Sequence, residues 1–324
     1  MPVPRDAKKP AGKKPAKERE NVPAGPERKA VSLLDFVHIR KICTGRYGDI
    51  VYVRDKRSNQ CLVLKHIQLH RLDQASLVRL RNEVELQKEL RHPNILRAYG
   101  YFRDPKERRL FIMVAHADGG TMLQFIKDQP KGRLSEEVAA NFAMQMTLGL
   151  QYLHDVAKVI HRDIHAENIL LDKGVLKIAD FGCCVQDDSR VRTTMCGTLD
   201  YLAPERLTGR SYDYRVDLWA LGVLVTEFLI GKATFQAGED DCVVVRILNL
   251  ELRFPSYLSK DARGLIQKLL RLDPDDRLPL DKVLEPPWIQ QHNPPAVEAT
   301  ASAPPSGGAL FPPPSEAAAS SRRH

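Results

Sequence analysis

The most telling residues of this chain are His161-Arg162-Asp163-Ile164-His165-Ala166-Glu167-Asn168, followed by Lys177-Ile178-Ala179-Asp180-Phe181-Gly182. Asp163 would orient a hydroxyl nucleophile or accept its proton. Asn168 and Asp180 would coordinate divalent ions through oxygen atoms, which Mg²⁺ prefers as ligands. Together these groups predict phosphoryl transfer from ATP.

A phosphate-binding region is predicted upstream of these residues. Gly45 and Gly48 lie between two strand-like runs, where glycines let the backbone approach phosphates. Lys65 follows on an apolar strand, where an ammonium group is costly unless it meets an anion. ATP phosphates and one carboxylate would satisfy it. Glu83, on a helical run, is the candidate carboxylate, and the alternative is that Glu83 simply faces solvent.

The pattern of the chain predicts one catalytic unit with two tails. We expect a disordered basic arm over residues 1–34, a catalytic domain over 35–290 and a disordered Pro/Ala/Ser-rich tail over 291–324. Within the domain, short β-rich runs and one helix precede a half with helical spacing. The predicted strands are 37–42, 50–54, 61–67 and 110–114, and the predicted helices are 77–90, 138–154, 215–230 and 260–270.

Composition excludes some classes and leaves others open. No run approaches the roughly 18 apolar residues of a membrane span, so we expect no membrane partner and a soluble, intracellular protein. The formal charge of +8 is partly carried by the first 30 residues. This arm would serve nuclear targeting or contact chromatin or microtubules; a solubilising tail is an equally good interpretation. The six cysteines show no metal-ligand spacing and are interpreted as reduced thiols.

The order of these groups resembles the eukaryotic protein kinases from Phe36 to Trp288. Further matches are Ala203-Pro204-Glu205, the run from Asp217 to Gly222, and Arg277. The resemblance implies an α+β, bilobal protein kinase fold: a small antiparallel β lobe with one main helix (35–114), a hinge (115–118) and a larger, mainly helical lobe (119–290). It also implies a Glu205–Arg277 pair and support of the catalytic loop by Asp217.

Within the kinases, the chain resembles the Aurora family. The runs from Arg91 to Arg97 and from Arg192 to Leu202 are nearly identical to Aurora sequences. The resemblance implies that phosphorylation of Thr194 activates the enzyme, with Arg162 and Arg192 binding the phosphate. An activating protein segment would dock on the small lobe. Work in mitosis and chromosome segregation, in nucleus and cytoplasm and at the spindle or chromosomes, is likewise implied.

The predicted substrates are proteins with basic residues near the acceptor hydroxyl. By resemblance, Glu167 would receive an arginine two residues before the acceptor. Arg192 stands two residues before Thr194, so the activation segment itself fits this pattern and predicts autophosphorylation in trans.

The nucleotide site departs from the family pattern at several positions. Cys43 replaces the first glycine of the phosphate loop, and Val63 replaces a smaller alanine, which narrows the adenine site. Ile50 would line this site, and the hinge residues Ala115 and Ala117 would offer backbone groups to the nucleotide.

His165 stands where these kinases place a lysine that contacts the transferred phosphoryl group. A cation there offsets transition-state charge, whereas an imidazole loses its charge near pH 6.5. We expect reduced or pH-dependent turnover.

Three alternatives stay open from the sequence. The first is a pseudokinase, or a weakly active kinase owing to His165, that acts as a scaffold, although Lys65, Asp163 and Asp180 are retained. The second is a basic-directed kinase outside the Aurora group. The third is a nucleic-acid or chromatin module led by the basic arm, which would leave residues 36–288 unexplained.

Overall fold

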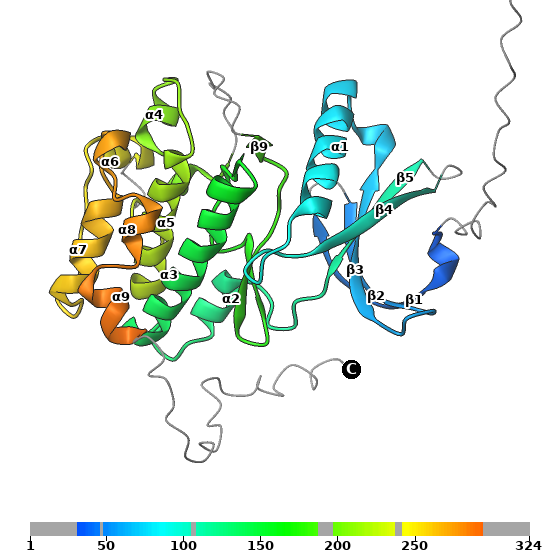
Figure 1. The fold of residues 1–324 in the computed structure, drawn as a ribbon, viewed down its shortest axis with the longest axis horizontal. Helices are drawn as coiled ribbons and strands as arrows, with labels where there is room; N and C mark the ends of the chain where they lie inside the picture. Colours follow the sequence, from blue (N-terminus) through cyan, green and yellow to red (C-terminus); the bar gives the residue numbers. More distant parts are fainter. Residues whose placement is uncertain (1–30, 46–47, 105–107, 187–196, 237–241, 294–324) are drawn as a thin grey trace, which may run out of the picture. The chain divides into compact units, whose positions relative to one another are not determined.

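The structure, a computed structural model, describes residues 31–45, 48–104, 108–186, 197–236 and 242–293 (Figure 1). The predicted basic arm, Arg192, Thr194 and the tail beyond residue 293 lie outside these residues, apart from a few residues at their borders. From Ser32 onward, the described residues belong to one compact unit.

The N-terminal lobe is a five-stranded antiparallel sheet with one main helix, as predicted (Figure 1). The strands lie in the order β1-β2-β3-β5-β4. β4, at one edge, was not predicted. The elements are β1 (Phe36–Gly45), β2 (Gly48–Asp55), β3 (Cys61–Gln68), α1 (Gln74–Glu89), β4 (Ala98–Asp104), β5 (Arg109–Ala115), and the short η1 (Leu33–Asp35) and η2 (Leu69–Arg71).

The two faces of β3 belong to different apolar clusters because side chains alternate along a strand. Val63 and Ile67 pack with Leu80 and Val84 of α1. Leu62 and Leu64 pack on the opposite face with an aromatic layer that includes Phe102 and Phe111. The alternation places Lys65 on the face that carries α1.

The C-terminal lobe is mainly helical, which confirms the predicted α+β class. Its long helices match the predicted ranges closely, and the predicted helix over 138–154 continues from α3 into a π-helical turn, η3. The elements are α2 (Met122–Lys127), α3 (Glu136–Gln151), η3 (Tyr152–Val156), β6 (Val159–Ile160), β7 (Ile169–Asp172), β8 (Val175–Ile178), β9 (Val185–Gln186), η4 (Leu199–Tyr201), α4 (Pro204–Leu207), α5 (Arg215–Ile230), α6 (Val243–Leu248), α7 (Lys260–Leu269), η5 (Pro274–Asp276), α8 (Leu280–Val283) and α9 (Pro287–His292).

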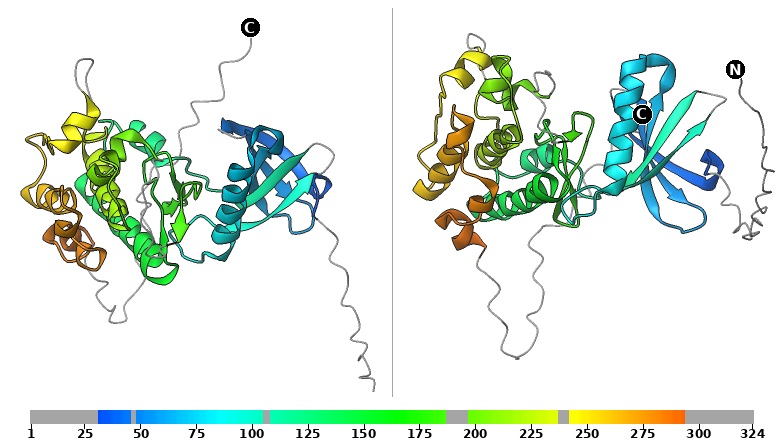
Figure 2. Two further views of the ribbon diagram at one scale, coloured as in Figure 1. Left: turned by 90° about the horizontal axis from the view of Figure 1, so that it is seen from above. Right: turned by 45° about the horizontal axis from the view of Figure 1, so that its top comes forward.

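Helix α5 lies at the centre of this lobe, beside α3 and α7 (Figures 1 and 2). Every residue from Val216 to Leu229 is buried, which explains a sequence that is apolar on all sides. The helix ends at Gly231, whose φ of 86° is a conformation that favours glycine. No helix within the described ranges is long and apolar enough to cross a membrane.

The predicted catalytic residues lie between the strands of two small sheets, the pair β6–β9 and the hairpin β7–β8. The segment from His161 to Asn168 joins β6 to β7, and Asp180 follows β8. β8 is also bonded to the loop before β4, because the amide of Leu96 donates to the carbonyl of Ile178 (2.9 Å). The predicted catalytic loop therefore leads directly into the β7–β8 hairpin, and Asp180, the predicted metal ligand, follows it.

Candidate active site

Asp163 lies at the centre of the site and is held by two neighbours. The side-chain amide of Asn168 donates to the Asp163 carboxylate (3.1 Å) and to its carbonyl oxygen (3.0 Å). The backbone amide of Thr198 donates to the other carboxylate oxygen (3.1 Å). The Asp163 side chain remains 21% exposed, so an incoming hydroxyl could still reach it. The contact from Thr198 was not anticipated from the sequence.

The oxygen atoms of Asn168 and Asp180 suit Mg²⁺. The amide nitrogen of Asn168 is committed to Asp163, which leaves its oxygen for a cation. The Asp180 side chain is 51% exposed, and the positive charge of Lys65 lowers the pKa of this carboxyl. No cluster of three or more His, Cys, Asp or Glu side chains arranged for a metal occurs among the described residues. This donor set fits an ion that takes few protein ligands and several from substrate phosphates.

The predicted ion pair between Lys65 and Glu83 is not formed. The Lys65 ammonium lies 3.7 Å from the Asp180 carboxylate, and among the described residues no Glu83 oxygen lies within 4.0 Å of it. Glu83 instead points toward Gly182, where an added Cβ would lie 3.6 Å from its carboxylate. Burial raises the pKa of Glu83 to about 7, with Asp180 adding to the effect and Lys65 opposing it. Glu83 is thus partly neutral at pH 7 and competes weakly for the lysine.

Gly48 is required by packing as well as by the predicted phosphate contact. Its φ is 152°, and a Cβ there would lie only 2.1 Å from the carbonyl oxygen of His66 on β3. Gly45, at the end of β1, is less constrained, since a Cβ added there would meet only ordinary contacts. The intervening residues 46 and 47 lie outside the described ranges.

The predicted nucleotide pocket corresponds to an apolar cluster shared by the two lobes. Val63 is buried in it, and Ile50, Ala115 and Ala117 pack against it together with Leu170 of β7. The backbone amide of Ala117 has no hydrogen-bond partner among the described residues, so it could donate to an adenine ring. Val63 pairs across the sheet with Val114, so both bulky side chains lie at the same level of the pocket.

A buried layer supports the catalytic loop, as predicted. Asp217 accepts hydrogen bonds from the amides of His161 (2.9 Å) and Arg162 (2.8 Å) and contacts the ring of His154 (2.8 Å). Arg162 needs this support because its φ of 69° is unfavourable for a non-glycine residue. Burial alone would raise the pKa of Asp217, but the hydrogen bond from His154 and the charges of the neighbouring groups hold it below its usual value.

The predicted pair between Glu205 and Arg277 is formed and buried. The guanidinium donates to both carboxylate oxygens, at 2.7 and 2.6 Å. Such a bidentate pair is geometrically specific, and it fixes α4 to the segment after η5.

His165 lies beside the catalytic aspartate. Its Nε2 is 3.6 Å from the Asp163 carboxylate, and its ring is 5.9 Å from that of Tyr201. The side chain is buried, with little access to solvent. The histidine therefore occupies a position from which it could contact a transferred group.

Arg162, predicted to bind a phosphate on Thr194, has other partners in the structure. Its guanidinium donates to the carbonyl of Cys183 (2.5 Å) and to the hydroxyl of Tyr212 (2.8 Å). Thr194 and Arg192 fall outside the described residues, so their predicted roles stay predictions.

Comparison with known proteins identifies the family. The protein kinase domain family matches residues 36–289. Aurora kinase A-A of Xenopus laevis is 44% identical over 265 residues, which are 81% of this chain and 64% of that protein. Aurora kinase B of Xenopus tropicalis is 42% identical over 282 residues (85% and 77%), and the Aurora kinase of Schizosaccharomyces pombe is 39% identical over 272 (83% and 75%).

The chain belongs to the Aurora family of protein serine/threonine kinases. A basic-directed kinase outside this group is therefore ruled out. The chain spans just under two thirds of the length of the first of these relatives.

An acidic cluster around Glu167, the predicted substrate contact of this Aurora-family kinase, was only partly anticipated. Glu167 is exposed, as a substrate contact requires. Burial raises the pKa of Glu227 on α5 to about 7, and the charges of Asp200 and Glu167 add to the effect. The hydroxyl of Tyr201 donates to Glu227. Sequence reasoning missed Glu227 because it lies in a long apolar helical run. A charged residue within such a run is the signal that could have found it.

Proposed function

We propose that this Aurora-type kinase transfers the γ-phosphate of ATP to serine and threonine hydroxyls of proteins. The observation that carries the proposal is a pair of contacts: Asn168 donates to Asp163, and Lys65 lies 3.7 Å from Asp180. Asp163 would hold the acceptor hydroxyl in position, and Lys65 would move from Asp180 to the nucleotide phosphates. Mg²⁺ held by Asn168 and Asp180 would offset phosphate charge.

We infer that its substrates carry arginine two residues before the acceptor. Glu167 supplies an exposed carboxylate, and Glu227 supplies a buried one whose pKa stays raised although the charge of Lys127 opposes the effect of burial. An arginine side chain would favour the ionised form of Glu227 and so bind where this cluster lacks a counter-charge.

We further propose activation by phosphorylation of Thr194 and by a protein segment on the N-terminal lobe. The sequence around Thr194 fits the enzyme's own substrate pattern. The docking surface would include Val78 of α1 with Tyr99 and Tyr101 of β4, three large side chains that remain exposed. A role in mitosis at the spindle or chromosomes, and contact of the basic arm with chromatin or microtubules, remain proposals from the resemblance.

Mass spectrometry of the protein incubated with Mg-ATP tests the proposal. Wild type should acquire phosphate on Thr194, and Asp180→Asn should acquire none. Loss of the signal in a kinase-inactive background, with recovery when active enzyme is added, would establish the trans reaction. A wild-type protein that modifies neither itself nor a basic peptide would favour the scaffold interpretation.

A further inference from the structure

A second cavity lies outside the catalytic centre, beside the loop that joins α1 to β4. Its volume is about 400 Å³, within the range of ligand pockets. Its walls come from residues 90–97, from Ala115 at the end of β5, and from Asp172 and Lys177 of the β7–β8 hairpin. Ala115 is the one lining residue that the predicted nucleotide site shares, and Lys65, Asp163, Asn168 and Asp180 are not in the lining.

Positive charge dominates the lining of this cavity. Arg91, Arg97 and Lys177 face a single carboxylate, that of Asp172. Among the described residues, none of these three cations lies within 4.0 Å of any carboxylate oxygen. Unpaired like charges around one concavity favour an anionic occupant.

Two of the cations are fixed in place by backbone carbonyls. The guanidinium of Arg91 donates to the carbonyl of Leu90 (2.8 Å) and to that of Lys88, at the end of α1. The ammonium of Lys177 donates to the carbonyl of Pro93 (2.6 Å). Because these bonds exist before any ligand arrives, less conformational freedom is lost on binding.

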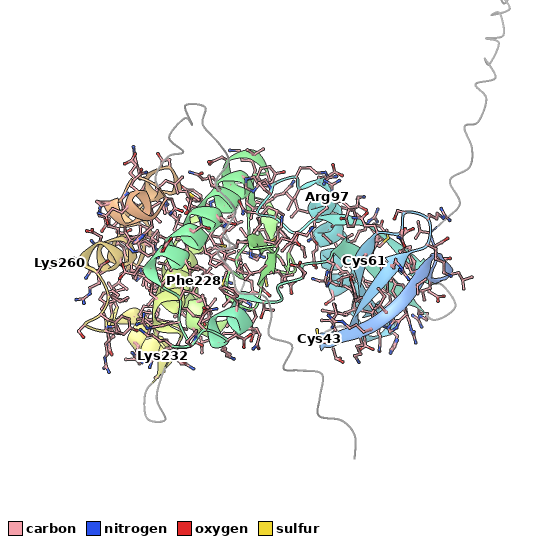
Figure 3. The ribbon with its side chains drawn as sticks, turned by 90° about the horizontal axis from the view of Figure 1, so that it is seen from below. Cys43, Cys61, Arg97, Phe228, Lys232 and Lys260 are labelled. Atoms are coloured by element: carbon pink, nitrogen blue, oxygen red, sulfur yellow. The ribbon has the colours of Figure 1, made fainter. Side chains whose placement is uncertain are left out.

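Arg97 is the adjustable group. Its side chain is exposed and makes no hydrogen bond or ion pair with the described residues (labelled in Figure 3). It can therefore close over a bound anion without losing a contact.

The floor of the cavity is apolar and argues for a peptide. Leu90, Ile95 and Leu96 are nearly fully buried beneath the charged rim. The only aromatic ring in the lining is that of His92, which already stacks on Tyr152 (5.1 Å). Burial and the charge of Lys177 lower the pKa of His92, which favours the neutral form of this ring. A nucleic acid would lack a free surface for base stacking.

We propose that this cavity binds an acidic peptide segment of a partner protein, which inserts one apolar side chain onto the floor while flanking carboxylates meet Arg97 and Lys177. Apolar anchoring with charge recognition at the rim is a common way to bind short segments. The site goes beyond the proposed phosphoryl transfer and does not depend on it.

Fluorescence anisotropy with the full chain tests the proposal. The probe is a fluorescein-labelled peptide Glu-Asp-Leu-Asp-Glu, and its control is the amide counterpart Gln-Asn-Leu-Asn-Gln. The acidic peptide should bind wild type, and the amide peptide should bind about tenfold more weakly. Arg97→Glu should weaken the acidic peptide by about tenfold or more.

Arg103→Glu is the matched control. Arg103 is also an exposed arginine of the β4 segment, but it does not line the cavity. The Arg103→Glu protein should bind the acidic peptide like wild type. Both variants, Arg97→Glu and Arg103→Glu, should keep wild-type activity on a basic peptide substrate. Hydrogen exchange should show protection at residues 90–97 and 172–177 when the acidic peptide is added.

Four results would overturn the proposal. One is an equal loss of affinity in both variants, which would mean general attraction to a basic lobe. A second is the absence of acidic-peptide binding to wild type, and a third is protection confined to the substrate face. The fourth is binding of a single-stranded oligonucleotide that needs Arg97 while peptide binding does not, which would assign the cavity to nucleic acid.

Discussion

Two sets of buried carboxylates in this kinase behave in opposite ways. Asp217 and Glu205, beneath the catalytic loop, each receive several hydrogen bonds from fixed donors. Glu83 and Glu227 receive fewer: Glu227 accepts one hydrogen bond, from the Tyr201 hydroxyl, and burial raises the pKa of each carboxyl to about 7. The first set holds parts of the fold together through these hydrogen bonds. The second set is poised to ionise when a cation approaches.

The largest expected effect is on chemistry alone. Asp163→Asn should lower kcat by about 10²–10⁴-fold, because the amide cannot accept the hydroxyl proton. The melting temperature of the Asp163→Asn protein should stay close to that of wild type, since the partly exposed Asp163 side chain faces the substrate and not the core. The measurement is steady-state phosphorylation of a basic peptide, with Asp155→Asn, an exposed aspartate of η3, as the control.

Removing one partner of the buried Glu205–Arg277 pair should lower the stability of the fold. Arg277→Ala leaves the Glu205 carboxylate buried and unpaired, and should cost about 3–5 kcal/mol of unfolding free energy. Urea denaturation measures the loss. Arg271→Ala removes an exposed arginine nearby and should change stability little. A stable Arg277→Ala protein would contradict the division into two sets.

His165→Lys tests what positive charge beside Asp163 contributes to the rate. A permanent cation beside Asp163 should raise kcat on the order of tenfold, because it offsets charge that develops on the transferred phosphoryl group. His165→Gln, which adds no charge, should show no gain. If wild type and the lysine variant have equal, flat rates from pH 6 to 8, the histidine has no part in the mechanism.

The smallest expected effect concerns Glu227, the buried carboxylate proposed to bind the substrate arginine. Because the pKa of Glu227 is raised from 4.5 to about 7, the group is mostly neutral at pH 6 and mostly ionised at pH 8. The KM for a peptide with arginine two residues before the acceptor should therefore fall a few-fold over that range. Glu227→Gln should flatten the trend, and a peptide with alanine at that position serves as the control. A trend that persists in Glu227→Gln must arise elsewhere.

Much of the site could be predicted because its chemistry is written in short local runs. The segment from His161 to Asn168 and Asp180 flank one short hairpin, β7–β8, so spacing along the chain was enough to bring their groups together. Helix α5 was predicted with its observed bounds because a long apolar run ends at Gly231. β4 was missed: its Ala98 and Gly100 weaken the strand signal, and the strand forms only because β5 pairs with it.

The sequence by itself determined which groups are present and in what order: a lysine, an aspartate, an asparagine and a metal-binding aspartate of a kinase. Only the tertiary structure decided which carboxylate meets Lys65, which acids stay neutral and which cations gather at a second cavity. The physical reason is that charge and burial act through space. Glu83, Asp180 and Lys65 influence one another across elements that are far apart along the chain.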